Sequence, residues 1–226
     1  MKKILIISDT HLTDRFDRKK FMFLQKIIGE ADQVIINGDF WDGYITTFSR
    51  FINSSWKKLF AQLRRKKTVY LYGNHDPKEM CDKRASKFSV KQLLRYDFKF
   101  KDVTYRVEHG QAFEPGAMGI FHLIPDIRNV QVAVNIFLGK VEGVLLKIFG
   151  IKFVRNILYG QLNNDVKKKI KPLLKPKEVF VFGHTHKAEI DLKNGLVDSG
   201  FIRHGLGTYL TLDENGIKLR EEWYSR

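Results

Sequence analysis

The sequence is short of cysteine, of long apolar runs and of acidic residues. Its only cysteine, Cys81, excludes an internal disulfide and is typical of a reducing compartment. The amino-terminal MKK is followed by only four apolar residues before Ser8, too few for the apolar region of a signal peptide. No stretch reaches the roughly 18 uninterrupted apolar residues that a membrane-spanning helix needs. These absences predict a cytoplasmic protein.

The shortage of acidic residues leaves a strongly basic chain. There are 25 Asp and Glu against 40 Lys and Arg, which gives a net charge of +15. Such a surface attracts phosphate-bearing partners, namely nucleotides, nucleic acid or anionic lipid, although solubility alone would also explain it. No recognisable nucleic-acid module and no patterned basic–aromatic stripe occurs, so no nucleic-acid partner is expected. The expected partners are phosphate-containing small molecules, with contact to an anionic membrane surface as a further candidate.

Apolar runs alternate with amphipathic segments along most of the chain. The 226 residues, 43% of them hydrophobic, suffice for one domain spanning residues 1–226 with a proper core. No internal repeat or low-complexity segment occurs. Strands interleaved with helices predict an α/β fold with a partly parallel, buried sheet. The expected helices are 18–30 and 56–67, and the expected strands are 3–8, 33–37, 68–72, 103–109, 178–184, 195–199, 207–213 and 217–224.

Polar side chains that suit a metal site follow five of these expected strands. They are Asp9 and His11 in SDTH, Asp39 and Asp42 in NGDFWD, Asn74, His75 and Asp76 in GNHD, His109 in EHG, and His184 and His186 in GHTH. The carboxyl ends of strands in open α/β sheets meet at one crevice. Because side chains alternate along a strand, the two residues of each D-x-H or H-x-H pair should point to the same side. Carboxylate, amide and imidazole donors together favour Mn²⁺, with Fe or Zn²⁺ as alternatives, over Mg²⁺ or Ca²⁺.

In this order, the motifs resemble those of the calcineurin-like metallophosphoesterase superfamily, over residues 8–186. The resemblance implies a four-layer αββα sandwich that hydrolyses a phosphate ester or anhydride with two divalent metal ions. It further implies that one metal is held by Asp9, His11, Asp39 and His186, and the second by Asp39, Asn74, His109 and His184. It gives His75 a catalytic role at the leaving oxygen, Asp76 the role of orienting the His75 imidazole, and Asp42 that of orienting a ligand histidine.

The strand pattern stops between about 113 and 176, where we expect a helical insertion. Phe137, Val141, Val144, Leu145 and Ile148 recur with helical spacing, Lys140 and Lys147 share another face, and a basic stretch covers 167–177. A basic and apolar helical surface suits a membrane, whereas a cap packed on the sandwich is the alternative.

A helical insertion in this place resembles the UDP-2,3-diacylglucosamine diphosphatase group. That resemblance implies a lipid-linked nucleotide as substrate, with peripheral contact at the inner face of the membrane. One residue departs from the pattern: many members of that group have Arg where this chain has His75. A soluble nucleotide or general phosphodiesterase therefore remains an alternative, and a nucleic-acid-processing phosphoesterase a weaker one.

Overall fold

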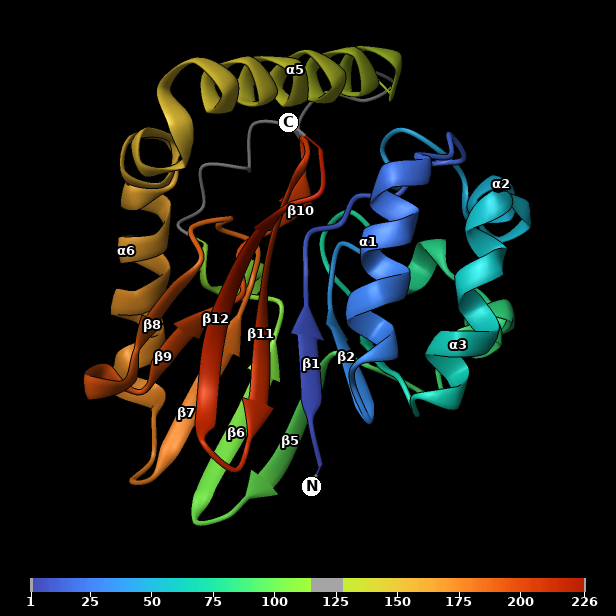
Figure 1. The fold of residues 1–226 in the computed structure, drawn as a ribbon. Coiled ribbons are helices and arrows are strands. Elements are labelled where there is room, and N and C mark those ends of the chain that lie inside the picture. Colours follow the sequence, from blue (N-terminus) through green and yellow to red (C-terminus); the bar gives the residue numbers. More distant parts are fainter. Residues whose placement is uncertain (1, 115–127, 226) are drawn as a thin grey trace.

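The computed structural model describes residues 2–114 and 128–225 as two β-sheets packed face to face, with helices on both outer faces (Figure 1). This arrangement confirms the expected αββα sandwich. Part of the expected insertion, residues 115–127, lies outside the described residues. No helix among the described residues is long and apolar enough to cross a membrane.

The first sheet has a parallel centre and antiparallel additions on one side. Strands β1 to β4 run parallel, and β11 pairs antiparallel with β1 and carries β10 and β12 as its other partners. Its outer face is covered by α1, α2 and α3 (Figure 1). The strands are β1 (Ile4–Ile7), β2 (Gln33–Asn37), β3 (Val69–Leu71), β4 (Lys91–Leu93), β10 (Ile202–Arg203), β11 (Leu206–Asp213) and β12 (Gly216–Trp223), and the helices α1 (Arg18–Gly29), α2 (Phe48–Asn53) and α3 (Phe60–Arg65).

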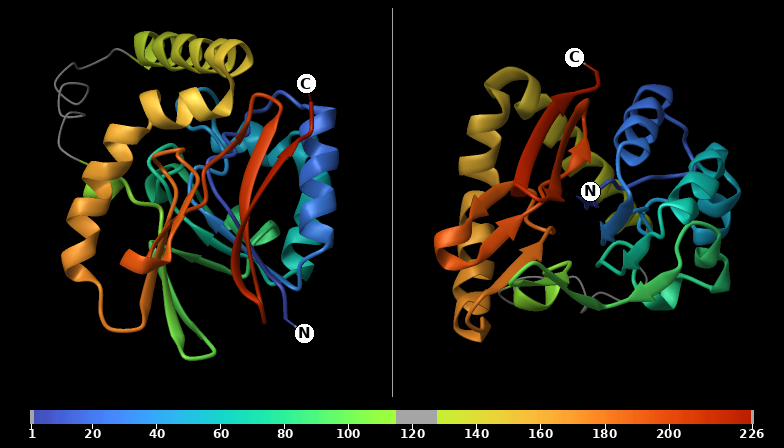
Figure 2. Two further views of the ribbon diagram at one scale, coloured as in Figure 1. Left: turned by 60° about the vertical axis from the view of Figure 1, so that its left-hand side comes forward. Right: turned by 60° about the horizontal axis from the view of Figure 1, so that its bottom comes forward.

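The second sheet has the strand order β5-β6-β7-β9-β8, in which β6, β7 and β9 are parallel. Helix α6 covers its outer face, and α5 lies across the end of both sheets, as the two further views also show (Figure 2). Gly150, with a φ of 76°, interrupts α5 near its carboxyl end. The elements are β5 (Arg95–Phe100), β6 (Val103–Glu108), β7 (Glu178–Phe182), β8 (Glu189–Asp191), β9 (Leu196–Asp198), α5 (Arg128–Phe153) and α6 (Gly160–Ile170).

Strand β1 shows how a short apolar run builds two layers of core. Its four residues are all buried. Leu5 and Ile7 pack in the cluster beneath α1 and α3, whereas Ile4 and Ile6 pack in the cluster between the two sheets. Alternate side chains of a strand point to opposite faces, so a strand that is buried on both faces needs apolar residues at every position.

Most of the expected elements are confirmed, but one expected helix differs and several elements were not expected. The expected helix 56–67 is a 3₁₀ turn, Ser55–Leu59, followed by α3. Helix α2 and the strands β4, β5, β8 and β10 were not expected from the sequence. Strand β5 pairs antiparallel with β6 and places Tyr96 and Phe98 against the core between the sheets.

Candidate metal centre

The polar residues that follow five strands meet at the end of the sandwich that faces α5. They follow β1, β2 and β3 of the first sheet and β6 and β7 of the second. Backbone hydrogen bonds join the loops: the His11 amide donates to the Asp39 carbonyl at 2.9 Å, and the Gly183 amide donates to the His109 carbonyl at 2.9 Å. These backbone hydrogen bonds fix the strand ends relative to one another without any contribution from side chains.

The local backbone at these loops differs from the sequence-based expectation. The side chains of the Asp9–His11 pair and of the His184–His186 pair were each expected to point to one side, because side chains alternate along a strand. Instead they lie in turns with left-handed backbone, with φ of 51° at Asp9, 43° at His11, 63° at His184 and 61° at His186. Asp39, with a φ of 51°, does the same. Left-handed backbone is uncommon outside glycine and is concentrated at functional sites, where the surrounding structure holds it in place.

Two buried carboxylates, Asp9 and Asp39, lie at the centre of the cluster. Asp9 Oδ1 is 3.2 Å from His186 Nε2 and 3.9 Å from His11 Nε2. Asp39 Oδ2 is 3.3 Å from His109 Nε2 and 3.7 Å from His11 Nε2. Three groups of ligand atoms lie close enough together to hold an ion: Asp9, His11 and His186; Asp9, Asp39 and His109; and His11, Asp39 and His75.

Asn74 extends this cluster toward His184. Its side-chain oxygen is 3.1 Å from His109 Nε2 and 2.9 Å from His184 Nδ1. All seven residues expected from the sequence as ligands are therefore brought together. Gly73, next to Asn74, is needed for close approach, because a Cβ there would lie 2.2 Å from Asp39 Oδ1.

Four histidines lie nearest to Asp9, Asp39 and Asn74. In each of them, the ring nitrogen that points away from these three residues faces another oxygen. The pairs are His109 Nδ1 with the Asn37 carbonyl at 2.7 Å, His184 Nε2 with Glu114 at 3.1 Å, His11 Nδ1 with Asp42 at 3.4 Å, and His186 Nδ1 with Glu142 at 3.4 Å. An oxygen on one nitrogen favours the tautomer that leaves the other nitrogen with its lone pair free for a metal. The arrangement therefore orients four imidazoles toward one centre.

The residues fit divalent metal ions. Asp9 Oδ1 and His11 Nε2 are buried and make no hydrogen bond among the described residues. Buried polar atoms without partners are costly, so such atoms in a native site point to a missing ligand. Carboxylate, amide and imidazole donors together are the set that transition-metal ions accept.

Burial and neighbouring charge perturb the pKa values of the centre. Burial alone would lower the pKa of His109, but the Asp39 and Asp9 carboxylates raise it to about 10. Burial opposes ionisation of Asp39, yet His109 and His75 hold its pKa well below the usual range. Burial, together with the charge of Arg203, lowers the pKa of His11 to about 4. The centre thus combines ionised carboxylates with a neutral His11 imidazole and a His109 imidazole that must lose a proton before a metal binds.

Asp76 does not orient His75, and that expectation is wrong. The buried Asp76 carboxylate accepts hydrogen bonds from the backbone amides of Gly73 at 2.8 Å, Asp39 at 2.9 Å and Phe40 at 2.7 Å. It therefore fixes the loops after β2 and β3 to each other. The carboxylate that faces His75 Nδ1 is Asp42, at 3.2 Å. Asp42 lies between His75 and His11, which agrees with its expected role of orienting a ligand histidine.

Glu142 on α5 is a contact of the centre that sequence reasoning missed. Its Oε1 faces His186 Nδ1 and accepts from the Tyr159 hydroxyl, and its Oε2 is 3.2 Å from His204 Nε2 and 3.4 Å from Arg203 Nη1. A lone carboxylate inside the apolar run FLGKVEGVLL was the available signal. A cavity of about 440 Å³ opens beside it, with walls that include His11, Asp42, His75, Glu142, Tyr159 and His186.

The comparisons with known proteins agree with this geometry. The sequence model of the calcineurin-like phosphoesterase family matches residues 2–188, so the chain belongs to that family. It is therefore a metal-dependent phosphoesterase that acts on phosphate-containing substrates.

Solved structures share the fold at low sequence identity. An archaeal phosphodiesterase is 17% identical over 98% of this chain and 99% of its own, with a TM-score of 0.50. Yfce, a phosphoesterase from E. coli, is 14% identical over 99% of this chain and 100% of its own, with a TM-score of 0.46. No functionally curated protein matches the chain by sequence.

Proposed function

We propose that the chain hydrolyses a phosphodiester or pyrophosphate bond with two divalent metal ions. One ion is held by Asp9, His11, Asp39 and His186, and the second by Asp39, Asn74, His109 and His184. The observation that supports this proposal is the oxygen beside the outward nitrogen of each ligand imidazole. It is a hydrogen-bond partner at His109 and His184 and a longer contact of 3.4 Å at His11 and His186, and the other nitrogen of each ring faces Asp9, Asp39 or Asn74. When bound, the two ions supply Lewis-acid activation of phosphate and water.

His75 is the proposed general acid for the leaving oxygen. Its side chain is 18% exposed and lines the cavity of about 440 Å³ beside Glu142, which we call the catalytic cavity. Burial would lower its pKa, but the Asp39 and Asp42 carboxylates raise it above the ordinary value. A raised pKa favours the protonated ring, which donation to a leaving group requires. Asp76 contributes indirectly, because it fixes the loop that carries His75.

Mn²⁺ is the proposed metal, with Fe or Zn²⁺ as alternatives. The proposed donor set mixes imidazole nitrogen with carboxylate and amide oxygen, which is less suited to Mg²⁺ or Ca²⁺. Elemental analysis of the purified protein tests both identity and number, and about two ions per chain are expected. A protein that keeps full activity after exhaustive chelation contradicts the metal assignment.

The proposed substrate is a lipid-linked nucleotide such as a UDP-diacylglucosamine-like molecule. Residues 113–176 are proposed as a helical insertion within a single domain, and α5 lies over the metal centre. Much of the apolar stripe expected on α5 is exposed: Phe137 by 65%, Val144 by 53% and Ile148 by 67%. A plain cap would bury this stripe against the sandwich, whereas contact with acyl chains or a membrane needs it exposed.

The basic stretch after α5 supports membrane contact less than the sequence suggested. Lys167 is only 17% exposed and pairs with Glu189 at 3.1 Å and Asp191 at 2.8 Å. Lys169 donates to the Glu114 carbonyl at 3.0 Å, which leaves Lys168, at 78% exposed, as the most accessible of the three. The proposed membrane contact therefore rests on the exposed apolar side chains of α5.

An activity screen with Mn²⁺ over a UDP-linked lipid, cyclic nucleotides and a chromogenic phosphodiester tests the reaction and the substrate together. Hydrolysis of the UDP-linked lipid, with a rate that depends on detergent, supports the lipid-linked substrate. Hydrolysis of the water-soluble esters alone supports a soluble nucleotide or general phosphodiesterase. Failure of the chain to sediment with anionic vesicles at low salt refutes the membrane contact.

A further inference from the structure

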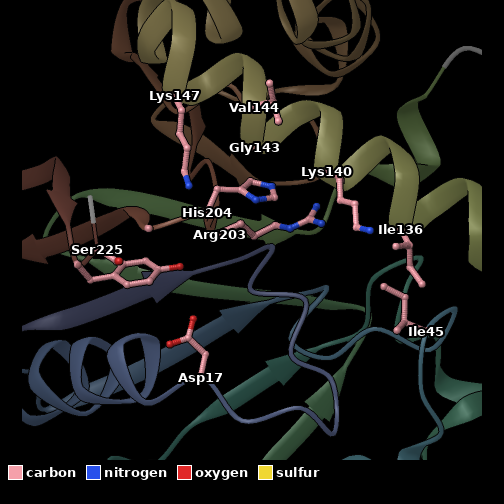
Figure 3. Close-up of a pocket in the computed structure, with 13 residues that line it drawn as sticks. Asp17, Ile45, Ile136, Lys140, Gly143, Val144, Lys147, Arg203, His204 and Ser225 are labelled. Atoms are coloured by element: carbon pink, nitrogen blue, oxygen red, sulfur yellow. The ribbon is translucent and has the colours of Figure 1, made fainter.

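A second cavity, of about 690 Å³, lies between α5 and the turn that joins β10 to β11 (Figure 3). Its walls come from α5, from Arg203 and His204, from the segment at Tyr224 and from Asp17 at the start of α1. Gly139 and Arg203 line both this cavity and the catalytic cavity beside His75 and His186. The two cavities are therefore neighbours that share a wall.

Cations dominate the wall of this second cavity. Lys140 and Lys147 of α5 and Arg203 point into the same space, alongside His204 (Figure 3). Among the described residues that line the cavity, Asp17 is the only one with a carboxylate, and it also accepts a hydrogen bond from the Lys20 amide at 3.0 Å as the cap of α1. No ion pair of Lys140 or Lys147 is found among the described residues. Such a wall attracts an anion with more than one negative charge.

Arg203 and His204 are held in place against α5. Glu142 contacts both of them, Arg203 at 3.4 Å and His204 at 3.2 Å. Two glycines on α5 provide the room: a Cβ at Gly139 would lie 2.9 Å from an Arg203 nitrogen, and one at Gly143 would lie 2.8 Å from His204 Nδ1. The guanidinium is thus fixed before a ligand arrives, which lowers the entropic cost of binding.

We propose that this cavity binds a second phosphate group of the substrate, separated from the phosphate that is cleaved at the metal centre. The inference rests on the proposed hydrolysis at the metal centre and favours substrates with a phosphate outside the scissile bond, a different substrate class from a UDP-diacylglucosamine-like molecule. Two lysines beside a fixed guanidinium match a phosphate, which carries up to two negative charges at neutral pH. Ile45, Ile136 and Val144 also line the cavity and would contact the sugar, base or other group that carries this phosphate.

A pair of ligands that differ by one phosphate tests the site without turnover. Thymidine 5′-monophosphate and thymidine 3′,5′-bisphosphate are titrated into the Mn²⁺-loaded protein by calorimetry. The bisphosphate should bind the wild-type chain more tightly, by up to about 25-fold from the two lysines, since each exposed lysine–phosphate pair contributes up to about fivefold. The Lys140→Gln/Lys147→Gln double variant should lose most of this preference and keep only the part that Arg203 contributes. Lys152→Gln is the matched control, because Lys152 is an exposed lysine of α5 outside the walls of both cavities.

Equal affinity of the wild-type chain for both thymidine nucleotides overturns the proposal, and so does a preference that is undiminished in the double variant. Glucose 6-phosphate and glucose 1,6-bisphosphate repeat the comparison without a base. A preference with this pair too assigns recognition to the phosphate itself, whereas its absence assigns the site to phosphorylated nucleosides. If the preference is present but the p-nitrophenyl ester of thymidine 5′-monophosphate is not hydrolysed, the proposed function fails while the second site stands.

Discussion

Replacement of Glu142 by Gln tests whether the insertion helix supports the metal centre. The Glu142 carboxylate is 11% exposed and faces His186, His204 and Arg203, all between 3.2 and 3.4 Å away, and accepts from the Tyr159 hydroxyl. The substitution removes the charge and keeps the shape of the side chain. It leaves His186 Nδ1 facing an amide instead of a carboxylate.

Two separate losses are expected from Glu142→Gln. Removal of a partner that orients a ligand histidine lowers metal affinity by roughly 10–100-fold. Removal of one partner from a buried charge network costs roughly 3–5 kcal/mol, and the low end, about 3 kcal/mol, applies because the amide still accepts from Tyr159. For a chain of this length, that corresponds to a fall in Tm of about 6–12 °C.

The assay combines Mn²⁺ titration by calorimetry with thermal unfolding of the metal-depleted protein. Glu221→Gln is the control, since the Glu221–Arg155 pair, at 2.5 Å, also joins the insertion to the sandwich but touches no candidate ligand. The control should lose about 1 kcal/mol at most and keep the metal affinity of the wild type. A Glu142→Gln variant that loses stability but binds Mn²⁺ as the wild type does would refute the link to the metal centre.

Three further predictions follow from the same geometry. Asp39→Ala should lose both ions in elemental analysis, because Asp39 is the proposed bridge; two ions that remain tightly bound contradict the assignment. His75→Ala should keep its metal content and lose on the order of 10²–10⁴ in rate on esters with a poor leaving group, but less on nitrophenyl esters. Metal loss from that variant would make His75 a ligand. Burial lowers the pKa of Lys20 from 10.5 to about 7, so between these values the unfolded chain holds a proton that the folded chain has lost. Stability should therefore rise with pH across this window, by up to about 1.4 kcal/mol per pH unit, and Lys20→Met should flatten the rise in urea unfolding curves.

The sequence predicted which residues gather at this end of the sandwich because each motif is local. Asp9, Asn74 and His109 each follow an apolar run, parallel strands bring their carboxyl ends to one edge within each sheet, and the packed sheets place the two edges side by side. The prediction failed where neighbours in sequence are not neighbours in space. Asp76 directly follows His75, yet the turn directs its carboxylate to three backbone amides and away from the ring.

Contacts that depend on how whole elements pack could not be predicted. Glu142 reaches His186 only because α5 lies across the end of both sheets, and nothing in the local pattern fixes that placement. The helical spacing on α5 did not settle which face packs on the sandwich: Leu146, outside the expected stripe, is 1% exposed, whereas Ile148 of the stripe is 67% exposed. Strand β5, RYDFKF, alternates apolar and charged residues with a period of two, but its charges concealed the pattern of a half-buried strand.

The insertion contacts the metal centre at two separate points, which connects substrate choice with metal binding. Glu114, at its start, faces His184 at 3.1 Å, and Glu142, within α5, faces His186 at 3.4 Å. The same helix presents Lys140 and Lys147 to the second cavity and apolar side chains to solvent. A substrate that displaces α5 would therefore also disturb His186, the proposed ligand that Glu142 faces. We expect productive substrates to fit beneath α5 without moving Glu142, which would let this helix select substrates through the position of a metal ligand as well as through its own contacts.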